Sequence, residues 1–379
     1  MKIIIPTFER IEWMPPTITL VRKLVSMGHE VTYITIYPDA YFAGEEGIRN
    51  VALCKKTICL QEKVPYIRGL SSILWRADNA IKKIISRRVK KAVDKEMQQG
   101  DLLWVVNEMT VMLAGSWWLR SRDFLFTVYE LHENRFYARN IRRAAQMAGR
   151  VIVPEYNRAH IMKARYKLKK LPIVLPNKSD IPTQFTLSER ETAALETIQE
   201  LKRRGKTVIA YMGGIGSERP LEPLLDAIQG NDKYILAVIG RESEYLHKLQ
   251  KAYENIIYLG GFRTPNHLAV AKEADIGLIV YVSLNDAQAM NALYCAPNKI
   301  YEYSGLGLPM LANDIPGLRY EIEFNRIGTV VDYEDPASIL SGLQELTDRR
   351  ADYAENEKVY FAKMDVDRII ADIVGDCAR

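Results

Sequence analysis

The sequence predicts an α/β protein with two domains, each built on a parallel sheet with helices on both faces. Short apolar runs alternate with amphipathic stretches along the whole chain, as they do in doubly wound sheets. This alternation starts afresh near residue 206, after a stretch rich in prolines and polar residues at 172–182. A length of 379 residues suits two such domains.

The first half opens with a strand–helix–strand unit. Residues 2–5 predict a buried strand, which Pro6 ends. A helix is predicted over 17–28, with Gly28 at its C-cap, and a second strand over 29–37. The later elements of this half are strands at 102–106, 124–131, 151–155 and 172–182 and a long basic helix over about 72–98.

The second half repeats this organisation. Its strands are predicted at 206–214, 234–240, 256–262, 275–282, 308–314 and 328–333, and its helices at 218–230, at 298–307 and over about the last 25 residues. We therefore expect one domain at 1–180, a linker near 178–200 and a second domain at 200–355. A helical tail at 356–379 can return to the first domain.

Composition narrows the class of protein. Hydrophobic residues make up 48% and charged residues 26%, so each half can bury a core. The four cysteines have no CxxC spacing and no accompanying His cluster, which argues against a zinc site and favours a reducing compartment. No run approaches the roughly 20 apolar residues of a membrane span. We expect a cytoplasmic protein that can sit at the inner membrane surface.

The most specific motif is the segment APNKIYEYSGLGLPMLANDIPG at 296–317. It resembles the nucleotide-sugar-binding segment of family 4-like GT-B glycosyltransferases, which commonly have PNK, an aromatic residue, Glu, Tyr and a Gly-x-Pro here. Other stretches resemble that family in the same order, namely 26–35, 210–228, 256–262 and 271–281. The resemblance implies two Rossmann-like domains facing one cleft and a nucleotide-sugar donor held by the second domain.

Asn298, Lys299 and Glu302 have the chemistry that such a donor needs. A lysine can neutralise a diphosphate, and a carboxylate can accept two hydrogen bonds from the ribose diol. Lys299 and Glu302 are three residues apart, so they share one face of a helix. The resemblance assigns ribose binding to Glu302 and places Lys299 near the phosphates. The alternative is a surface ion pair that only supports the helix.

Gly213 and Gly214 follow a predicted strand and precede a predicted helix, the setting of a phosphate-binding turn. The family usually has an Arg shortly after its first glycine, where this sequence has Gly214. Arg219 can replace the family's lysine and bind the diphosphate. The alternative for Arg219 is a solvated side chain at a helix start.

Tyr294 marks a departure from the family. Many retaining members have two Glu residues eight positions apart, and Tyr294 stands eight before Glu302. The first Glu, which lies near the sugar in those enzymes, is therefore missing. We expect residues 283–295 to form the sugar-contacting loop, with Asn291 and Tyr294 as contacts. The stereochemical outcome stays open, with a lean to retention.

In the first half, residues 129–134 (YELHEN) come at the carboxyl end of a predicted strand, where open α/β sheets bind ligands. The resemblance places His132 against the donor sugar, and Glu133 or Glu130 can act as a base if the enzyme inverts. Glu9 follows the first strand and is a candidate for acceptor contact or base chemistry. The alternatives are a structural histidine and a solvated loop.

The stretch at 75–97 predicts an amphipathic helix with a dense basic face. Such helices bind anionic membrane surfaces, where lipid-linked acceptors are presented. An ordinary surface helix is the alternative. No nucleic-acid-binding motif accompanies the charge, so we do not expect nucleic acid as a partner.

Together these features predict transfer of a sugar from a nucleotide-diphosphate donor, with UDP as the expected nucleotide, to a saccharide or lipid-linked saccharide. No DxD motif stands in a suitable loop, so we expect neither a metal nor another cofactor. Two rivals use the same scaffold. A nucleotide-sugar epimerase would convert the donor without an acceptor, and a non-catalytic scaffold subunit need not bind UDP.

Overall fold

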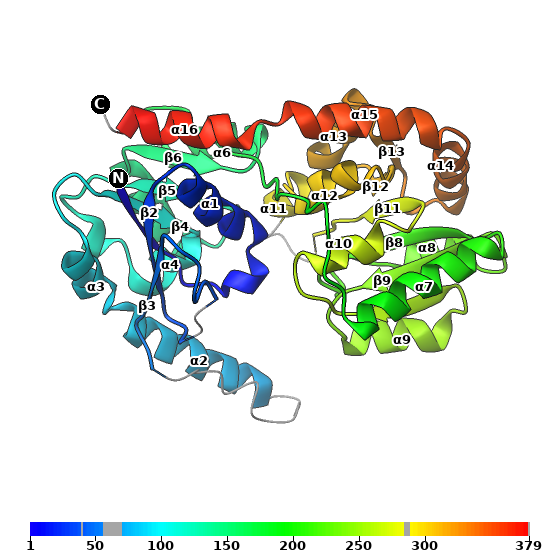
Figure 1. Ribbon diagram of the computed structural model, residues 1–379, viewed down its shortest axis with the longest axis horizontal. Coiled ribbons are helices and arrows are strands. Elements are labelled where there is room, and N and C mark those ends of the chain that lie inside the picture. Colours follow the sequence, from blue (N-terminus) through cyan, green and yellow to red (C-terminus); the bar gives the residue numbers. More distant parts are fainter. Residues whose placement is uncertain (39–40, 56–69, 284–288, 378–379) are drawn as a thin grey trace. The chain divides into compact units, whose positions relative to one another are not determined.

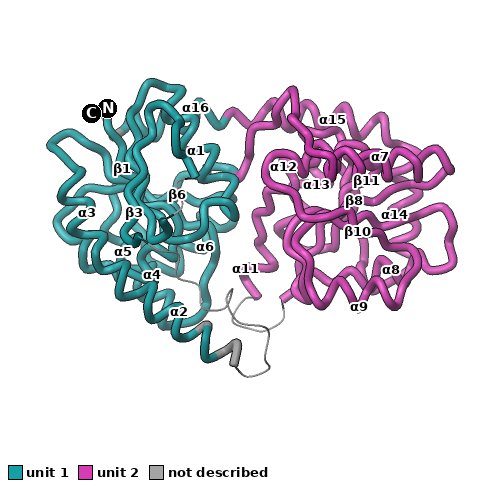
Figure 2. Tube along the Cα trace, turned by 60° about the horizontal axis from the view of Figure 1, so that its bottom comes forward, with its two compact units in different colours: residues 1–176, 366–379 teal, residues 177–365 magenta. Residues whose placement is uncertain are grey.

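The computed structural model describes residues 1–38, 41–55, 70–283 and 289–377. These residues form two compact units (Figure 2). Unit 1 combines residues 1–176 with the C-terminal segment from Val366, and unit 2 contains residues 177–365. Both units are α/β structures (Figure 1).

Unit 1 is built on a seven-stranded sheet in the order β3-β2-β1-β4-β5-β6-β7, and neighbouring strands are parallel. The chain winds outward from β1 through β2 and β3 and then returns to the other side of β1 as β4. The winding direction therefore reverses between β1 and β4. The strands are β1 (Lys2–Pro6), β2 (Glu30–Thr35), β3 (Ile48–Ala52), β4 (Leu102–Val106), β5 (Leu125–Thr127), β6 (Arg150–Val153) and β7 (Ile173–Val174).

Helices cover both faces of this sheet. Ile3 and Ile5 point to the face where apolar residues of α1 and α16 complete a buried core. Helix α3 packs against β1 and β2 and buries Val89 and Val93. The helices of unit 1 are α1 (Pro15–Ser26), α2 (Leu70–Ser86), α3 (Val89–Glu96), α4 (Glu108–Ala114), α5 (Arg135–Met147), α6 (Tyr156–Tyr166) and α16 (Val366–Cys377).

Unit 2 has a six-stranded parallel sheet in the order β10-β9-β8-β11-β12-β13. Helices α7, α10 and α12 contribute to the core on one face, and α8, α9 and α14 to the core on the other. The strands are β8 (Thr207–Met212), β9 (Tyr234–Ile239), β10 (Ile256–Gly260), β11 (Ile276–Ile279), β12 (Met310–Asn313) and β13 (Gly328–Val331). The helices are α7 (Glu189–Arg203), α8 (Glu222–Ile228), α9 (Glu244–Ala252), α10 (Asn266–Ala271), α11 (Ala289–Leu293), α12 (Asn298–Leu306), α13 (Pro316–Phe324), α14 (Pro336–Asp348) and α15 (Arg350–Lys363).

The winding of unit 2 reverses between β8 and β11, and these strands pair only through Ile209 and Ala210 in the middle of β8, opposite the first two residues of β11. The buried hydroxyl of Tyr303 on α12 fills the place where they part. It accepts from the backbone N–H of Met212 at 3.2 Å and donates to the carbonyl of Ala210 at 3.0 Å. A Cβ at Gly277 of β11 would come within 2.6 Å of this ring, so glycine lets α12 lie close to the sheet.

The predicted fold class is confirmed, including the C-terminal helix, which packs on unit 1 as α16. The tail expected at 356–379 is divided, because its first part completes α15 in unit 2. The expected linker at 178–200 contains the start of α7, which begins in a capping box made by Ser188 and Glu191. None of the helices in the described ranges is long and apolar enough to cross a membrane.

Three element bounds also differ from the prediction. The helix expected over 72–98 is interrupted at Arg87–Arg88, between α2 and α3. The strands expected at 124–131 and 172–182 shrink to β5 and the two-residue β7. Pro172 and Pro176 flank β7 and lack the N–H that a longer ladder requires.

Removing the Tyr303 hydroxyl tests its part in unit 2. Tyr303→Phe leaves two backbone groups of β8 without their partner in a dry environment, so we expect a loss of about 1–3 kcal/mol of unfolding free energy. Urea unfolding, followed by circular dichroism, measures this loss. The control is Tyr320→Phe, because Tyr320 is an exposed tyrosine on α13. Equal stability of the two variants would contradict the assigned role.

Candidate functional site

The described part of unit 2 gathers polar side chains where β8 and β11 part. Ligands of open α/β sheets bind outside the carboxyl ends of the strands at such a reversal of winding. Gly213 follows β8, Tyr281 follows β11, and α12 begins nearby with Asn298 and Lys299. Gly213 has a φ of +114°, and a Cβ there would lie 3.5 Å from the Lys299 ammonium. The glycine therefore brings bare backbone close to this lysine.

Lys299 is a buried lysine that forms no ion pair in the described part of the chain. The residue is 7% exposed, and its Nζ lies 5.0 Å from the ring centre of Tyr211 and 5.4 Å from that of Tyr281. Two aromatic faces thus hold the ammonium by cation–π attraction. Burial lowers the pKa of Lys299 to about 7, and the positive charge of Arg219 lowers it in the same direction.

Arg219 provides a second cation beside this lysine. Its guanidinium lies over the ring of Tyr281 at 4.9 Å and donates from Nη1 to Glu218 at 3.1 Å. Its Nε is buried and has no hydrogen-bond partner. A Cβ at Gly214 would lie 2.9 Å from Nη1, and the carbonyl of Gly214 accepts from the Tyr211 hydroxyl at 2.5 Å. The predicted glycine turn therefore packs directly against the guanidinium of Arg219.

The cations of this cluster are only partly paired. Glu218 forms an ion pair with Arg219, while Glu302 acts on Lys299 through its charge without an ion pair between them. A buried ammonium with no direct ion pair is costly unless a negative group can reach it. An anion bound here would relieve that cost and satisfy the buried Nε of Arg219.

Glu302 lies one turn further along α12 and is also buried, with 6% of its surface exposed. Its carboxylate accepts no hydrogen bond from the residues that the structure describes. Nε2 of His267 on α10 lies 3.8 Å from its Oε1. Nδ1 of His267 is buried and unpartnered. Glu302 therefore offers free acceptor positions beside the cationic cluster.

The remaining residues predicted in this half differ in how closely they join the cluster. Asn298 is the first residue of α12 and is half-buried. Tyr294 is half-buried in the turn between α11 and α12, where its N–H donates to the carbonyl of Met290 at 3.0 Å. Part of the expected sugar-contacting loop at 283–295, namely residues 284–288, lies outside the described residues.

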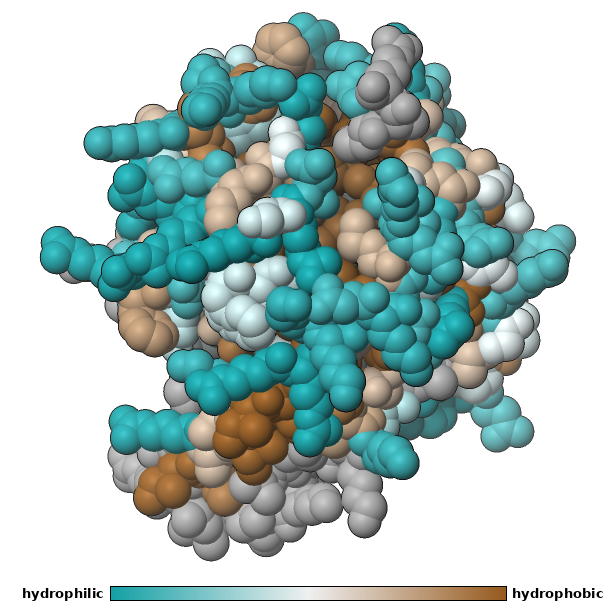
Figure 3. Space-filling view, turned by 90° about the vertical axis from the view of Figure 1, so that its left-hand side faces the viewer, coloured by the Kyte–Doolittle hydropathy of each residue, from teal (hydrophilic) through white to brown (hydrophobic). Residues whose placement is uncertain are grey.

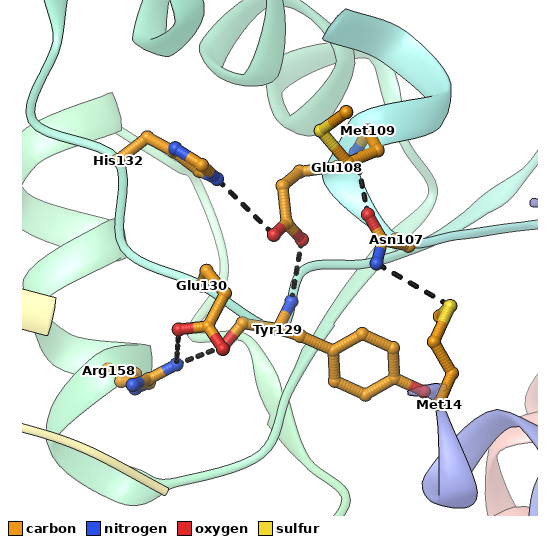
Figure 4. Close-up of polar contacts among 8 residues, drawn as sticks. All are labelled: Met14, Asn107, Glu108, Met109, Tyr129, Glu130, His132 and Arg158. Carbon is orange, nitrogen blue, oxygen red and sulfur yellow. Dashed lines mark hydrogen bonds and ion pairs between the residues drawn. The ribbon is translucent and has the colours of Figure 1, made fainter. Parts of the chain in front are cut away.

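In unit 1, His132 is paired with Glu108, a residue that the sequence analysis did not select (Figure 4). Nε2 of His132 lies 3.3 Å from Oε1 of Glu108. Burial by itself lowers the pKa of His132, but the hydrogen bond and the charge of Glu108 outweigh burial and raise it above its ordinary value. Glu108 follows β4 and His132 follows β5, so both lie at the carboxyl ends of the strands.

Glu9 also belongs to this end of the unit 1 sheet. Burial raises its pKa, and the negative charge of Glu108 acts in the same direction, while Arg10 and Lys82 oppose the shift. Glu133 is half-buried and follows His132, but the partner that the structure gives His132 is Glu108. His132 and Glu9 therefore lie at the same end of the unit 1 sheet. The acid paired with His132 is Glu108 rather than Glu133.

The basic helix differs in detail from its prediction. The apolar residues Ile85, Val89 and Val93 are buried in the protein, so they are not free to enter a membrane. Exposed apolar side chains remain at Ile84 of α2 and Phe136 of α5. In Figure 3, a mostly hydrophilic face carries apolar side chains at its lower end, where Figure 1 places α2.

The residues missed by sequence reasoning are Glu108 and His267. Glu108 is the first residue of α4, and His267 is the second residue of α10. Both helices are short and follow a strand, and such a position is a weak signal on its own. Among the described residues, no cluster of three or more His, Cys, Asp or Glu side chains is arranged to hold a metal ion.

Solved structures share this fold over almost the whole chain. HepE of Anabaena, determined in complex with UDP-glucose, has a TM-score of 0.71 at 15% identity, covering 100% of this chain and 99% of its own. Sucrose-phosphate synthase of Thermosynechococcus elongatus has a TM-score of 0.70 at 14% identity, covering 99% and 98%. A glycosyltransferase of Rickettsia africae has a TM-score of 0.65 at 14% identity, covering 100% and 97%.

No protein-family model and no curated protein sequence matches the chain. At these identities the structural likeness establishes the fold. The chain therefore has the two-unit α/β fold that the resemblance implied, shared with HepE, sucrose-phosphate synthase and the Rickettsia glycosyltransferase.

Proposed function

We propose that this protein is a glycosyltransferase that takes its sugar from a UDP-linked donor bound to unit 2. The observation that carries the proposal is the buried Lys299 ammonium, which forms no ion pair among the described residues and stands beside Arg219. A diphosphate can supply the missing ion-pair partner. Glu302, one turn further along the same helix, has free acceptor positions for a ribose diol.

The spacing of these groups supports a nucleotide rather than a simple phosphate. In a nucleotide the ribose is attached directly to the diphosphate, so a diol-binding acid must stand near the phosphate-binding cations. Lys299 and Glu302 meet that requirement because they are three residues apart on one helix. The UDP-glucose bound to HepE, which has the same fold, supports uridine as the base.

Lys299 and Arg219 also suit the chemical step. When the sugar leaves, negative charge grows on the diphosphate, and fixed cations in a dry site stabilise it. These two side chains can supply that charge without a metal. We further propose that the acceptor is a saccharide or a lipid-linked saccharide met by unit 1, where Glu9 is the candidate contact. Retention of the anomeric configuration stays a prediction.

Substitution of the ribose-binding acid tests the proposal. Glu302→Gln removes the negative charge while keeping the shape, so we expect UDP to bind about 10- to 100-fold more weakly, as measured by isothermal titration calorimetry. The loss should be smaller for 2′-deoxy-UDP, which lacks one of the two hydroxyl groups.

The matched control is Glu355→Gln. Glu355 pairs with Lys358 three residues later at 3.4 Å, and both side chains are exposed. This pair has the same sequence spacing as Lys299 and Glu302 but lies outside the proposed donor site. We expect the control to bind UDP as the wild type does. Failure of the wild type to bind UDP, or equal affinities of the two variants, would refute the proposed donor site.

We also propose that unit 1 contacts an anionic membrane surface through α2, α3 and α5. Lys83, Arg87 and Lys91 are exposed, and each lacks a carboxylate partner in the described part of the chain. The ammonium of Lys83 lies 5.9 Å from the ring of Phe136, so α5 adds to the same surface. The exposed basic residues of α5 are Arg135, Arg139, Arg142 and Arg143.

Vesicle sedimentation tests this surface. Replacing Lys83, Arg87 and Lys91 together by Gln should weaken binding to phosphatidylglycerol-containing vesicles about 100-fold, at about 1 kcal/mol per charge. The same charge change on unit 2, at Arg241, Lys248 and Lys251, should have little effect. Equal binding of the two variants, or equal binding of the wild type to pure phosphatidylcholine, would argue against the proposed surface.

A further inference from the structure

The carboxylate of Glu108 is held from two sides. The side chain is 3% exposed. Its Oε2 accepts from the backbone N–H of Tyr129 at 2.9 Å, and its Oε1 faces Nε2 of His132 at 3.3 Å (Figure 4). One oxygen is therefore fixed by the main chain, and the other is directed at the imidazole.

The backbone around Glu108 is fixed as well. Asn107 adopts a left-handed φ of +69°, and its side chain accepts from the N–H of Met109 at 2.6 Å, which caps α4. The hydroxyl of Thr110 donates to the carbonyl of Val106 at 2.9 Å. Asparagine takes positive φ more readily than most residues with a side chain, and here it is held in that conformation at the end of β4, where the winding of unit 1 reverses.

This arrangement selects one tautomer of the histidine. An ionised carboxylate can only accept, so the hydrogen of the neutral imidazole must be on Nε2. Nδ1 then has a lone pair and no partner among the described residues. With 26% of the side chain exposed, the histidine can be reached by a ligand.

We propose that Glu108 is a positioning residue that holds His132 as its Nε2–H tautomer, so that Nδ1 accepts a hydrogen bond from a hydroxyl group of a sugar bound to unit 1. The sugar-binding half of this role rests on the proposed function. The tautomer does not, because it follows from the contacts within unit 1 alone.

The charges around the imidazole determine whether removal of Glu108 raises or lowers the pKa of His132. Besides Glu108 on α4, the groups facing the ring are Glu130 in the same loop, Arg158 on α6 and Tyr137 on α5. Glu130 raises the pKa of His132, and Arg158, which pairs with Glu130 at 3.4 Å, lowers it. Removal of the Glu108 charge leaves burial and Arg158 to lower the pKa.

Nitrogen-15 NMR of the full chain, labelled at histidine, measures the tautomer and the pKa together. His132→Gln identifies the signal. In the wild type above the pKa of His132, we expect the proton on Nε2. In Glu108→Gln, we expect the proton affinity of the ring to fall about tenfold. Glu12→Gln is the control, because Glu12 is an exposed acid in the loop after β1 and should leave the signal unchanged.

A proton on Nδ1 in the wild type, or equal proton affinities in the Glu108 and Glu12 variants, would overturn the positioning role. The wild-type tautomer decides the question even if Glu108→Gln does not fold. Glu108→Gln should bind UDP as the wild type does, since the donor phosphates are assigned to unit 2. A wild type that fails to bind UDP would refute the proposed function and leave the tautomer result standing.

The sugar contact has its own readout. Among glucose, galactose and N-acetylglucosamine, we take the sugar that the wild type binds most tightly. Its affinity should fall in His132→Gln and by a similar factor in Glu108→Gln, and the double variant should lose no more than His132→Gln alone. An unchanged affinity in either single variant would contradict the contact.

Discussion

Both candidate sites depend on the place in each sheet where the winding reverses. There the first strand of the unit, β1 or β8, parts from its parallel neighbour, β4 or β11. Where the winding reverses, neighbouring strands send their following loops in opposite directions, and the space between them admits side chains. In unit 2 the Tyr303 hydroxyl replaces the missing ladder between β8 and β11. That bond ties α12 to the sheet, and α12 carries both Lys299 and Glu302.

The two sites have opposite electrostatic character. The unit 2 site has a buried ammonium with no ion pair and a guanidinium paired with Glu218, so it is prepared for a negative ligand. The unit 1 site contains Glu9, whose uncharged form is favoured by burial, and Glu108, which is paired with a histidine. Such a site suits neutral groups that exchange hydrogen bonds, as sugar hydroxyls do.

The fold and the central residues of the unit 2 site could be predicted from the sequence because both produce local sequence patterns. The alternation of strands and helices is local, and the PNK–Glu spacing lies on one helix. The pairings that complete the sites are not local. Glu108 and His132 come from different strand ends, and His267 and Glu302 from different helices, so only the tertiary structure brings them together. The apolar stripe of α3 was ambiguous for another reason, since helical periodicity does not reveal whether a stripe meets the core or a membrane.

The most direct test of the account is proton uptake on UDP binding. With a pKa of about 7, Lys299 is mostly uncharged at pH 8, and a diphosphate beside it would raise that pKa. Calorimetry in two buffers of different ionisation enthalpy should therefore show uptake of about one proton per UDP at pH 8, fading below pH 6 and absent in Lys299→Arg. Binding without proton uptake, or the same uptake in Lys299→Arg, would contradict the claim that this buried ammonium holds the donor.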